Sequence, residues 1–279
     1  MNVRFGRFED HVPDTSFHYV TVRSLHEAPL AIAARLRVPQ DGLAHHPAVI
    51  LLHGSSGPSL REGGYADVLN AAGMVTLEMD QWSARGLGGG AEGRPKTVVE
   101  TLADLYGARA FLAAHPAVDA ARIGVAGFSF GGVATMLAAT RRHNAGFLKN
   151  GHFRAFMPVY PATWTWNRIP NFEFGDLVDA PMLLITGEND QYDNDPETSR
   201  KLVSGLSLDD RVKITLKVMP NSHHGFDMPG ADMVVNDPFG NQGKGGLVIM
   251  RYNPEMSQQA HKLAAEFFKA NLVDEVMRT

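Results

Sequence analysis

The sequence predicts an α/β protein in which helices cover both faces of a mostly parallel sheet. Three observations support this fold class. Strand-like and helix-like segments alternate along most of the chain, which is typical of parallel strands joined by crossover helices. The segments 123–126 and 182–186 are nearly continuous apolar runs, as expected of strands covered on both faces. Signals for helix starts stand between the strand-like segments.

The predicted strands begin with two segments near the amino terminus and continue in regular alternation with helices. Their apolar and β-branched composition distinguishes them from the polar segments on either side. The predicted strands span residues 17–22, 30–38, 48–52, 75–79, 123–126, 155–159, 182–186 and 212–218.

The predicted helices are marked by capping residues. Thr97 and Glu100 have the spacing of a capping box, in which each side chain accepts a hydrogen bond from the other residue's backbone. Asp195-Pro196 and Asn253-Pro254 each read as an N-cap followed by proline at the first helical position. After Asn253, apolar residues recur on one face of a long final helix.

Length and composition favour a single domain over residues 1–279. Of the 279 residues, 44% are hydrophobic, which is enough for one sizeable core, and the chain contains no internal repeat and no domain linker. The net charge is −4, and no window is rich in Lys and Arg. We therefore expect neither nucleic acid nor an anionic membrane surface as a partner.

Cysteine is absent, which excludes disulfides, thiolate metal sites and a cysteine nucleophile. The first residues lack the apolar core of a secretory signal, and no stretch is long and apolar enough to span a membrane. The lack of a secretory signal and of a membrane span predicts a cytoplasmic protein. The glycine-rich stretches 86–93 and 240–246 lack the Lys-Ser/Thr ending of a phosphate loop, so they are interpreted as surface loops.

Ser129 is the candidate nucleophile. It lies in Gly127-x-Ser129-x-Gly131, between the predicted strand 123–126 and a helical segment. A sharp strand-to-helix turn needs small residues on both sides and presents the serine at the carboxyl end of the strand. The amide of Phe130 would then lie at a helix amino terminus, where it can stabilise an oxyanion. The alternative is a serine in an ordinary glycine-rich turn.

A serine nucleophile needs a base, and the base needs an acceptor that orients it. In serine hydrolases built around this kind of turn, the acid and the base follow the serine in that order. Asp190 follows the apolar strand 182–186, and we expect it to be the acid. Asp193 and Asp195 are nearby rivals, although Asp195 is already assigned to a helix cap. A turn residue that caps its own backbone is the alternative for Asp190.

The candidate base is one of two adjacent histidines, His223 and His224, which follow the last predicted strand. Neighbouring side chains on an extended segment point in opposite directions, so only one of them can serve. Spacing alone does not distinguish the two.

A second oxyanion amide is predicted after the strand 48–52. There His53-Gly54 leads into small residues, and Gly54 allows close approach of the backbone. The amide of Ser55 is the candidate donor. His53 precedes the nucleophile in the chain, and we expect it to order this loop by hydrogen bonding to the backbone.

Taken together, these motifs resemble those of the dienelactone hydrolase family over residues 49–268. The resemblance implies an α/β-hydrolase fold with an eight-stranded sheet, hydrolysis of an ester or lactone, and no large cap domain. It also implies that Asp190 is the acid and that the base is the histidine before Gly225, which is His224. The residues that carry it are His53-Gly54, Arg85-Gly86, residues 127–132, Tyr160-Pro161, residues 187–190 and residues 224–226.

Two departures from the family pattern concern the chemistry. Founding members of the family use cysteine where this chain has Ser129, and glutamate where it has Gly54. The loss of both together favours an ordinary serine triad and argues against dienelactone itself as substrate. Arg85 resembles the family's pocket arginine, which receives a substrate carboxylate. A solvated loop arginine is the alternative, because the loop is about one residue longer here.

Trp164 and Trp166 follow a strand end, where aromatic side chains could form a wall of the substrate pocket. Packing of a long loop onto the core is the alternative. The reaction expected from the candidate residues is hydrolysis of a small-molecule ester or lactone through an acyl-enzyme, with no metal and no cofactor. Peptidase or thioesterase activity with the same triad, and a non-catalytic binding protein on the same scaffold, are the rival interpretations.

Overall fold

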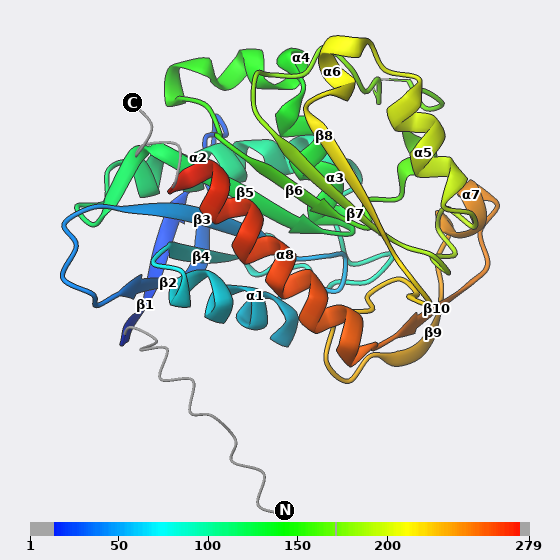
Figure 1. Ribbon diagram of the computed structural model, residues 1–279, viewed down its shortest axis with the longest axis horizontal. Coiled ribbons are helices and arrows are strands. Elements are labelled where there is room, and N and C mark those ends of the chain that lie inside the picture. The colour runs from blue at the N-terminus through cyan, green and yellow to red at the C-terminus, as the bar shows by residue number, and fades with distance from the viewer. Residues whose placement is uncertain (1–13, 171, 274–279) are drawn as a thin grey trace, which may run out of the picture.

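An eight-stranded sheet forms the centre of the computed structural model, which describes residues 14–170 and 172–273 (Figure 1). The strand order is β1-β2-β4-β3-β5-β6-β7-β8. Only β2 runs antiparallel to its neighbours, so the mostly parallel sheet is confirmed. The strands are β1 (Thr15–Arg23), β2 (Ala31–Pro39), β3 (His46–Leu52), β4 (Val75–Asp80), β5 (Val118–Phe128), β6 (Phe156–Val159), β7 (Met182–Gly187) and β8 (Ile214–Met219).

Every strand predicted from the sequence lies in this sheet, with small differences at the ends. The largest difference is at β5, which begins at Val118 rather than at residue 123. Strand β8 begins at Ile214 rather than at residue 212. Val212 ends the preceding helical turn, and its amide donates to the carbonyl of Leu208. The residues before β8 are therefore used to close a helix, although their composition is typical of a strand.

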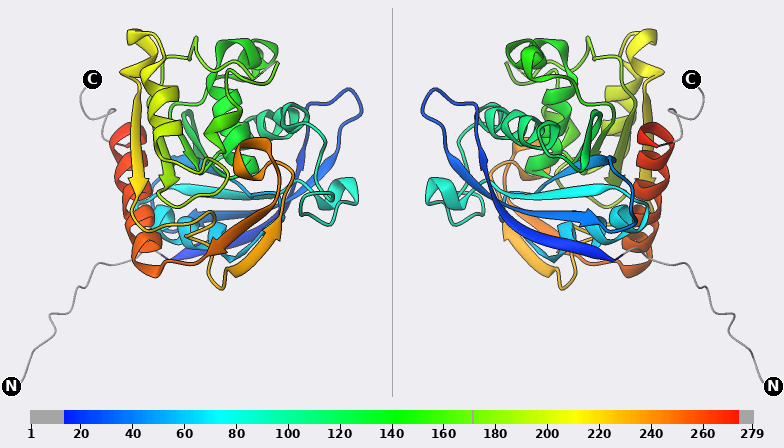
Figure 2. Two further views of the ribbon diagram at one scale, coloured as in Figure 1. Left: turned by 90° about the vertical axis from the view of Figure 1, so that its right-hand side faces the viewer. Right: turned by 90° about the vertical axis from the view of Figure 1, so that its left-hand side faces the viewer.

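Helices cover both faces of the sheet, as the two side views show (Figure 2). Each helix buries its apolar side against strands that are apolar on both faces. The longer helices are α1 (Leu60–Ala71), α2 (Leu102–Ala113), α3 (Phe130–Ala139), α5 (Glu197–Ser204) and α8 (Pro254–Leu272). The single-turn helices are α4 (Arg141–Asn144), α6 (Leu208–Arg211) and α7 (Gly240–Gly243).

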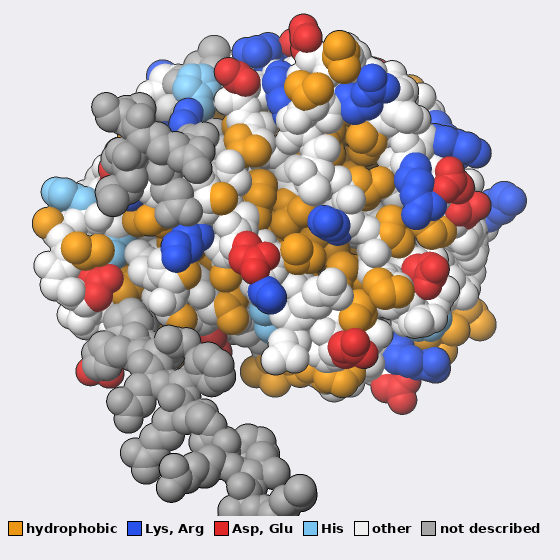
Figure 3. All heavy atoms as spheres, in the orientation of Figure 1, with side chains coloured by type: hydrophobic (Ala, Val, Ile, Leu, Met, Phe, Trp, Pro, Cys, Tyr) orange, Lys and Arg blue, Asp and Glu red, His pale blue; other side chains and the backbone are white. Residues whose placement is uncertain are grey.

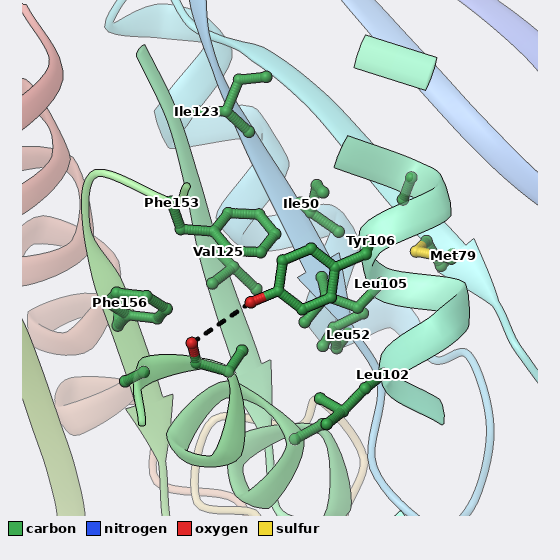
Figure 4. Close-up of a cluster of buried hydrophobic side chains, with 14 of the residues drawn as sticks. Ile50, Leu52, Met79, Leu102, Leu105, Tyr106, Ile123, Val125, Phe153 and Phe156 are labelled. Atoms are coloured by element: carbon green, nitrogen blue, oxygen red, sulfur yellow. Dashed lines mark hydrogen bonds between the residues drawn. The ribbon is translucent and has the colours of Figure 1, made fainter. Parts of the chain in front are cut away.

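Two apolar clusters lie on the two sides of the sheet. Helices α1 and α8 pack together on one face, with Tyr65 and Phe268 buried between them and the strands. Helices α2 and α3 pack on the other face around Tyr106, whose hydroxyl donates to the carbonyl of Ala138 at 3.4 Å (Figure 4). The clusters fix the positions of the strand ends, which carry the candidate site.

The predicted helix starts are found with their capping contacts. The side chain of Thr97 accepts from Val99 N, and Glu100 accepts from Thr97 N, so the capping box is confirmed before the turn that leads into α2. Asn253 caps α8. The helix α5 begins one residue later than predicted, with Pro196 at the cap, while the Asp195 carboxylate accepts from Glu197 N at 2.8 Å.

A small second sheet was not predicted. Strands β9 (Asp232–Asn236) and β10 (Leu247–Arg251) pair antiparallel, and α7 lies between them within the segment 240–246, which was predicted to be a loop. Met250 bridges to His224, so this hairpin lies against the predicted histidine loop. No large cap domain is present in the described part of the chain.

Two further predictions concern the surface of the chain. In residues 14–170 and 172–273, no helix is both long enough and apolar enough to cross a membrane. On the face that carries α1 and α8, acidic and basic side chains are scattered among apolar ones (Figure 3). Most of the amino-terminal segment used to judge a secretory signal, residues 1–13, lies outside the described residues.

Candidate active site

The candidate site lies where the strand order changes direction. Strand β4 lies on one side of β3, and β6 lies on the far side of β5, so the sheet is wound in opposite directions from this point. In doubly wound sheets, ligands bind outside the carboxyl ends of the strands at such a switch point. Ser129 directly follows β5, and His53-Gly54 follows β3, so these predicted elements meet there.

Ser129 occupies a strained turn between β5 and α3. Its backbone has φ 53° and ψ −113°, a conformation that residues other than glycine rarely adopt. The amide of Ser129 donates to the carbonyl of Val159 at 2.9 Å, and its carbonyl accepts from Val133 N at 2.9 Å. Both bonds hold the turn in place, so the hydroxyl extends from the edge of the sheet.

The glycines on both sides of Ser129 are required by space. A Cβ on Gly127 would lie 2.1 Å from the carbonyl oxygen of Gly131, and a Cβ on Gly131 would lie 2.4 Å from the carbonyl oxygen of Leu52. Any larger residue at either position would push the helix away from the sheet. The predicted reason for the Gly-x-Ser-x-Gly pattern is thus confirmed.

Three predicted side chains form a hydrogen-bonded row. His224 Nε2 lies 2.9 Å from Ser129 Oγ, and His224 Nδ1 lies 2.8 Å from Asp190 Oδ2. Asp190 and His224 are buried, and Ser129 is partly exposed. An imidazole held in this way can take a proton from the hydroxyl while the carboxylate stabilises the charge that results.

The ring of His224 is also fixed from its sides. The rings of Tyr160 and Tyr192 lie at centroid distances of 4.7 Å and 4.3 Å from it. Tyr192 N donates to Asp190 Oδ1 at 2.9 Å, so the second oxygen of that carboxylate is engaged as well. These contacts restrict the rotation of both the imidazole and the carboxylate.

The rivals of these residues have other partners. The Asp193 carboxylate accepts from Thr163 N, Thr163 Oγ1 and Trp164 N, and so holds the turn after β6. Burial, and then the charge of Asp190, raises the pKa of Asp193 to about 6. Asp195 is exposed at the start of α5. His223 makes no contact with the row, and its Nδ1 has no hydrogen-bond partner among the described residues.

The two predicted oxyanion donors belong to the two segments that meet at Ser129, the start of α3 and the loop after β3. Phe130 is the first residue of α3, so its amide has no acceptor within the helix. The Ser55 loop approaches from β3, and a Cβ on Gly54 would lie 3.4 Å from Ser129 Cβ. The carbonyl of Ser55 accepts from Trp82 Nε1 at 2.9 Å and from Gly90 N at 2.8 Å, which fixes the peptide unit that follows it.

His53 orders this loop through backbone contacts, as predicted. Its Nδ1 lies 2.8 Å from the carbonyl oxygen of Gly54, and its Nε2 lies 3.1 Å from Gln81 N. Burial lowers the pKa of His53 and favours the neutral ring. A neutral ring protonated at Nδ1 satisfies both contacts, with Nδ1 donating and Nε2 accepting.

An ion pair that was not predicted from the sequence joins the Ser55 loop to the hairpin β9–β10. Arg94 Nη1 donates to Ser55 Oγ at 2.6 Å, and the guanidinium contacts both Asp237 oxygens at 3.3 Å and 3.4 Å. The hydroxyl of Tyr192 donates to Asp237 Oδ2 at 3.0 Å. A continuous row of contacts therefore runs from Asp190 through Tyr192, Asp237 and Arg94 to Ser55.

A buried charged cluster lies beneath the Ser55 loop. Arg61 pairs with Glu62, Nε to Oε1 at 2.9 Å, and donates to the hydroxyl of Tyr160 at 3.1 Å. The hydroxyls of Tyr160 and Tyr65 both donate to Asp227. Burial, the largest single influence, opposes the charge of Arg61, but Glu62, Tyr160 and Asp227 together outweigh burial and raise the pKa of Arg61, which therefore stays protonated.

Nothing in the local sequence singles out Arg61, Arg94 or Asp237. Arg94 follows the glycine-rich stretch 86–93 and Asp237 follows an unpredicted strand, so their meeting depends on how two loops fold. Tyr160 could have been found, because Tyr160-Pro161 is part of the family resemblance. Tyr192 carries one weak signal, its position two residues after the predicted acid.

Three residues predicted to bind substrate are placed elsewhere. Arg85 Nη1 lies 2.8 Å from Asp104 Oδ2 and donates to the carbonyl of Gln81, away from the cavities at Ser129. Trp164 packs with Tyr192 and Val248, and Trp166 packs with Phe172 and Phe174. The structure thus favours the alternatives, a structural arginine and core tryptophans, because a buried carboxylate and two apolar clusters are their nearest partners.

Two cavities open at Ser129, and both are also lined by Ser55 and Tyr192. The smaller has a volume of about 90 Å³ and is lined by His224 and by the hairpin β9–β10. The larger has a volume of about 270 Å³ and is lined by residues of α3 and of the segment after β6. A small molecule seated against the Ser129 hydroxyl would have room on both sides.

The fold defines the class of protein: this is an α/β hydrolase, with Ser129 in the turn between β5 and α3. The family model for dienelactone hydrolases matches residues 90–272, more than half of the chain. The protein therefore belongs to the dienelactone hydrolase family and to the hydrolases that act on ester bonds. No curated protein is significantly similar in sequence.

Solved structures share the fold at low sequence identity. A dienelactone hydrolase from Anabaena variabilis is 21% identical, with 94% of this chain and 100% of that chain covered and a TM-score of 0.61. Est1E from Butyrivibrio proteoclasticus is 16% identical over 90% and 98% of the chains, with a TM-score of 0.57. A lidless α/β serine hydrolase from Xanthomonas campestris is 19% identical over 74% and 86%, with a TM-score of 0.52.

Proposed function

We propose that this protein cleaves a carboxylic ester or lactone through an acyl-enzyme, with Ser129 as nucleophile, His224 as base and Asp190 as the acid that orients the base. The observation that carries the proposal is the row of two hydrogen bonds, 2.9 Å from His224 Nε2 to Ser129 Oγ and 2.8 Å from His224 Nδ1 to Asp190 Oδ2. Each side chain has the partner that its role requires.

In the first step, Ser129 Oγ attacks the carbonyl carbon while His224 Nε2 takes the hydroxyl proton. The carbonyl oxygen becomes an oxyanion, which the amides of Phe130 and Ser55 receive; one such donor contributes roughly 3 kcal/mol in the transition state. Asp190 holds the imidazole with its proton on Nδ1 and stabilises the imidazolium. The C–O bond then breaks as His224 gives its proton to the leaving alcohol oxygen.

In the second step, His224 takes a proton from water, and the hydroxide attacks the acyl carbon. The bond to Ser129 Oγ breaks, and the proton returns from His224 to that oxygen. The acid is released, and the site regains its starting protonation state. All proton transfers use residues of this chain, so the proposed reaction needs no metal and no cofactor.

The proposal includes the setting of the reaction. The substrate is a small molecule rather than a nucleic acid or a membrane surface, the chain folds as one domain over residues 1–279, and the enzyme is cytoplasmic. These points rest on length, charge and composition. Calorimetry tests whether the chain folds as a single domain, for which we expect one cooperative unfolding transition. Cell fractionation tests the location.

A panel of p-nitrophenyl esters, lactones and aminoacyl amides tests the proposed function on purified protein. Turnover of esters or lactones, with loss of that turnover in Ser129→Ala, is the expected result. Faster turnover of the amides would favour a peptidase with the same triad. Turnover that persists in Ser129→Ala would remove Ser129 from its role. No turnover and no labelling by a fluorophosphonate would favour a binding protein.

A further inference from the structure

The two cavities at Ser129 differ in size and in the proposed reacting groups that line them. The larger, about 270 Å³, has three times the volume of the smaller, about 90 Å³. His224 lines the smaller cavity and is not among the residues that line the larger one. Phe130, whose amide is a proposed oxyanion donor, lines the larger cavity. The unequal cavities thus meet the ester group on opposite sides.

The chemistry assigns a side to each part of the ester. His224 must donate its proton to the leaving oxygen, so that oxygen lies within hydrogen-bond reach of Nε2. The alcohol carried by this oxygen then extends into the cavity that His224 lines. The acyl carbon is bonded to Ser129 Oγ with its oxygen toward the amides of Phe130 and Ser55, and its chain extends into the larger cavity beside Phe130.

We propose that the substrate is an ester of a bulky apolar acid with a short alcohol. This inference rests on the proposed function, because it uses His224 as the proton donor. The larger cavity holds the acyl chain through the acyl-enzyme stage, and the smaller cavity releases the alcohol. Water then enters the vacated smaller cavity, where it meets His224 for the second step.

The lining of the larger cavity fits an apolar acyl chain. Val133 of α3 is buried beneath it, and Ile169 and Phe172 form its side. Arg94 also lines this cavity, but its guanidinium is paired with the carboxylate of Asp237. A substrate carboxylate would have to compete with Asp237 for Arg94. Lys96 also lines this cavity but is exposed, and the wall of Val133, Ile169 and Phe172 favours an apolar chain.

The hairpin β9–β10 limits the smaller cavity. Val235 of β9 and Met250 of β10 line it, together with Met228 of the histidine loop. Met250 already packs on the histidine loop: its Cε lies so close to Gly225 that a Cβ added there would be 2.9 Å away. A long alcohol chain would have to displace this hairpin, and a methyl or ethyl group would not.

Two isomeric esters test the assignment, because they have the same composition but carry the bulky group on opposite sides of the ester bond. Ethyl 3-phenylpropanoate has a bulky acyl group and a short alcohol, and 3-phenylpropyl acetate has the reverse arrangement. The measured quantity is kcat/KM for each ester, divided by the rate constant of its hydroxide-catalysed hydrolysis. The ratio of this quantity for ethyl 3-phenylpropanoate to that for 3-phenylpropyl acetate should be about ten or more. One misplaced methylene in a pocket already lowers kcat/KM by about 10- to 200-fold.

Two variants, one in each cavity, give the assignment a residue-level test. Val133→Phe narrows the larger cavity and should lower the ratio about tenfold by slowing the phenylpropanoate ester. Val235→Ala widens the smaller cavity and should lower the ratio by speeding the acetate ester. Val212→Phe is the matched control, because Val212 is exposed at the end of α6 and lines neither cavity.

The outcomes separate this inference from the proposed function. Labelling of Ser129 by a fluorophosphonate, combined with a ratio that favours 3-phenylpropyl acetate or neither isomer, would overturn the inference alone. The same holds if Val235→Ala leaves the ratio unchanged, a result that does not depend on whether Val133→Phe folds. Absence of labelling and of hydrolysis of both isomers would overturn the proposed function and the inference together.

Discussion

Arg94 Nη1 lies 2.6 Å from Ser55 Oγ, so a residue paired with the hairpin β9–β10 also holds the loop that carries a proposed oxyanion amide. Arg94→Lys keeps the charge but loses the fork that reaches Ser55 and Asp237 together. We expect kcat to fall about tenfold, a part of the 10²- to 10³-fold cost of losing a whole donor. KM for ethyl acetate should change little, because the substrate still fits.

Steady-state kinetics of Arg94→Lys beside Arg211→Lys provides the measurement. Arg211 is an exposed arginine of α6, so its replacement controls for the loss of any one guanidinium. A rise in KM at constant kcat would show that Arg94 binds substrate and does not act through the Ser55 loop.

The two adjacent histidines should differ sharply. His224→Gln removes the group that bonds both Ser129 and Asp190, and we expect turnover to fall by about 10⁴-fold or more. His223→Gln should retain most of the turnover, since His223 is half-buried and outside the row. The initial rates of ester hydrolysis at a single substrate concentration decide this, and the opposite order would move the base to His223.

Asp190→Asn should lower kcat by up to about 10⁴-fold, because an amide fixes the wrong imidazole tautomer. Asp195→Ala serves as the control: it loses the contact with Glu197 N and about 1 kcal/mol of stability, with turnover preserved. The two variants are compared by kcat and by the free energy of unfolding in urea. Equal turnover in wild type and Asp190→Asn would exclude Asp190 as the orienting acid.

Asp193 should make stability depend on pH in an identifiable window. Its pKa is raised from 3.8 to about 6 in the folded protein by burial and then by the charge of Asp190. The folded state therefore binds a proton more tightly than the unfolded state, and this contribution to stability is complete below about pH 4 and lost as pH rises through 6.

Thermal unfolding of wild type and Asp193→Asn between pH 4 and 8 isolates this contribution, because Asn does not titrate. The Tm of wild type minus the Tm of Asp193→Asn should be largest near pH 4 and should decrease toward pH 7. A difference in Tm that stays constant across this range would contradict the raised pKa.

The sheet could be predicted because each strand is specified by its own residues. Segments such as 182–186 are apolar throughout and lie between turn residues, so local composition is sufficient. The turn at Ser129 could be predicted equally well from the sequence. The close contacts that require Gly127 and Gly131 come from within a few residues of the serine and from the neighbouring β3. Strands β9 and β10 were missed because each is short and largely exposed or half-exposed, and neither joins the central sheet.

The binding residues could not be predicted for a related reason. Arg85 and Arg94 both lie near the glycine-rich stretch 86–93, and the course of that loop decides which of them faces Ser129. The buried carboxylate of Asp104 holds Arg85, and Asp237, more than a hundred residues away in sequence, pairs with Arg94. Pairings between distant loops leave no pattern in either segment alone.

Mass spectrometry after treatment with a fluorophosphonate tests the central claim most directly, because only an activated serine reacts. The tryptic peptide of residues 123–141 contains Ser129 as its sole serine. We expect one adduct per chain on this peptide, no adduct in Ser129→Ala, and much slower labelling in His224→Gln. An adduct on a different residue, or labelling of the wild type and Ser129→Ala at the same rate, would contradict the assignment of Ser129 as the nucleophile.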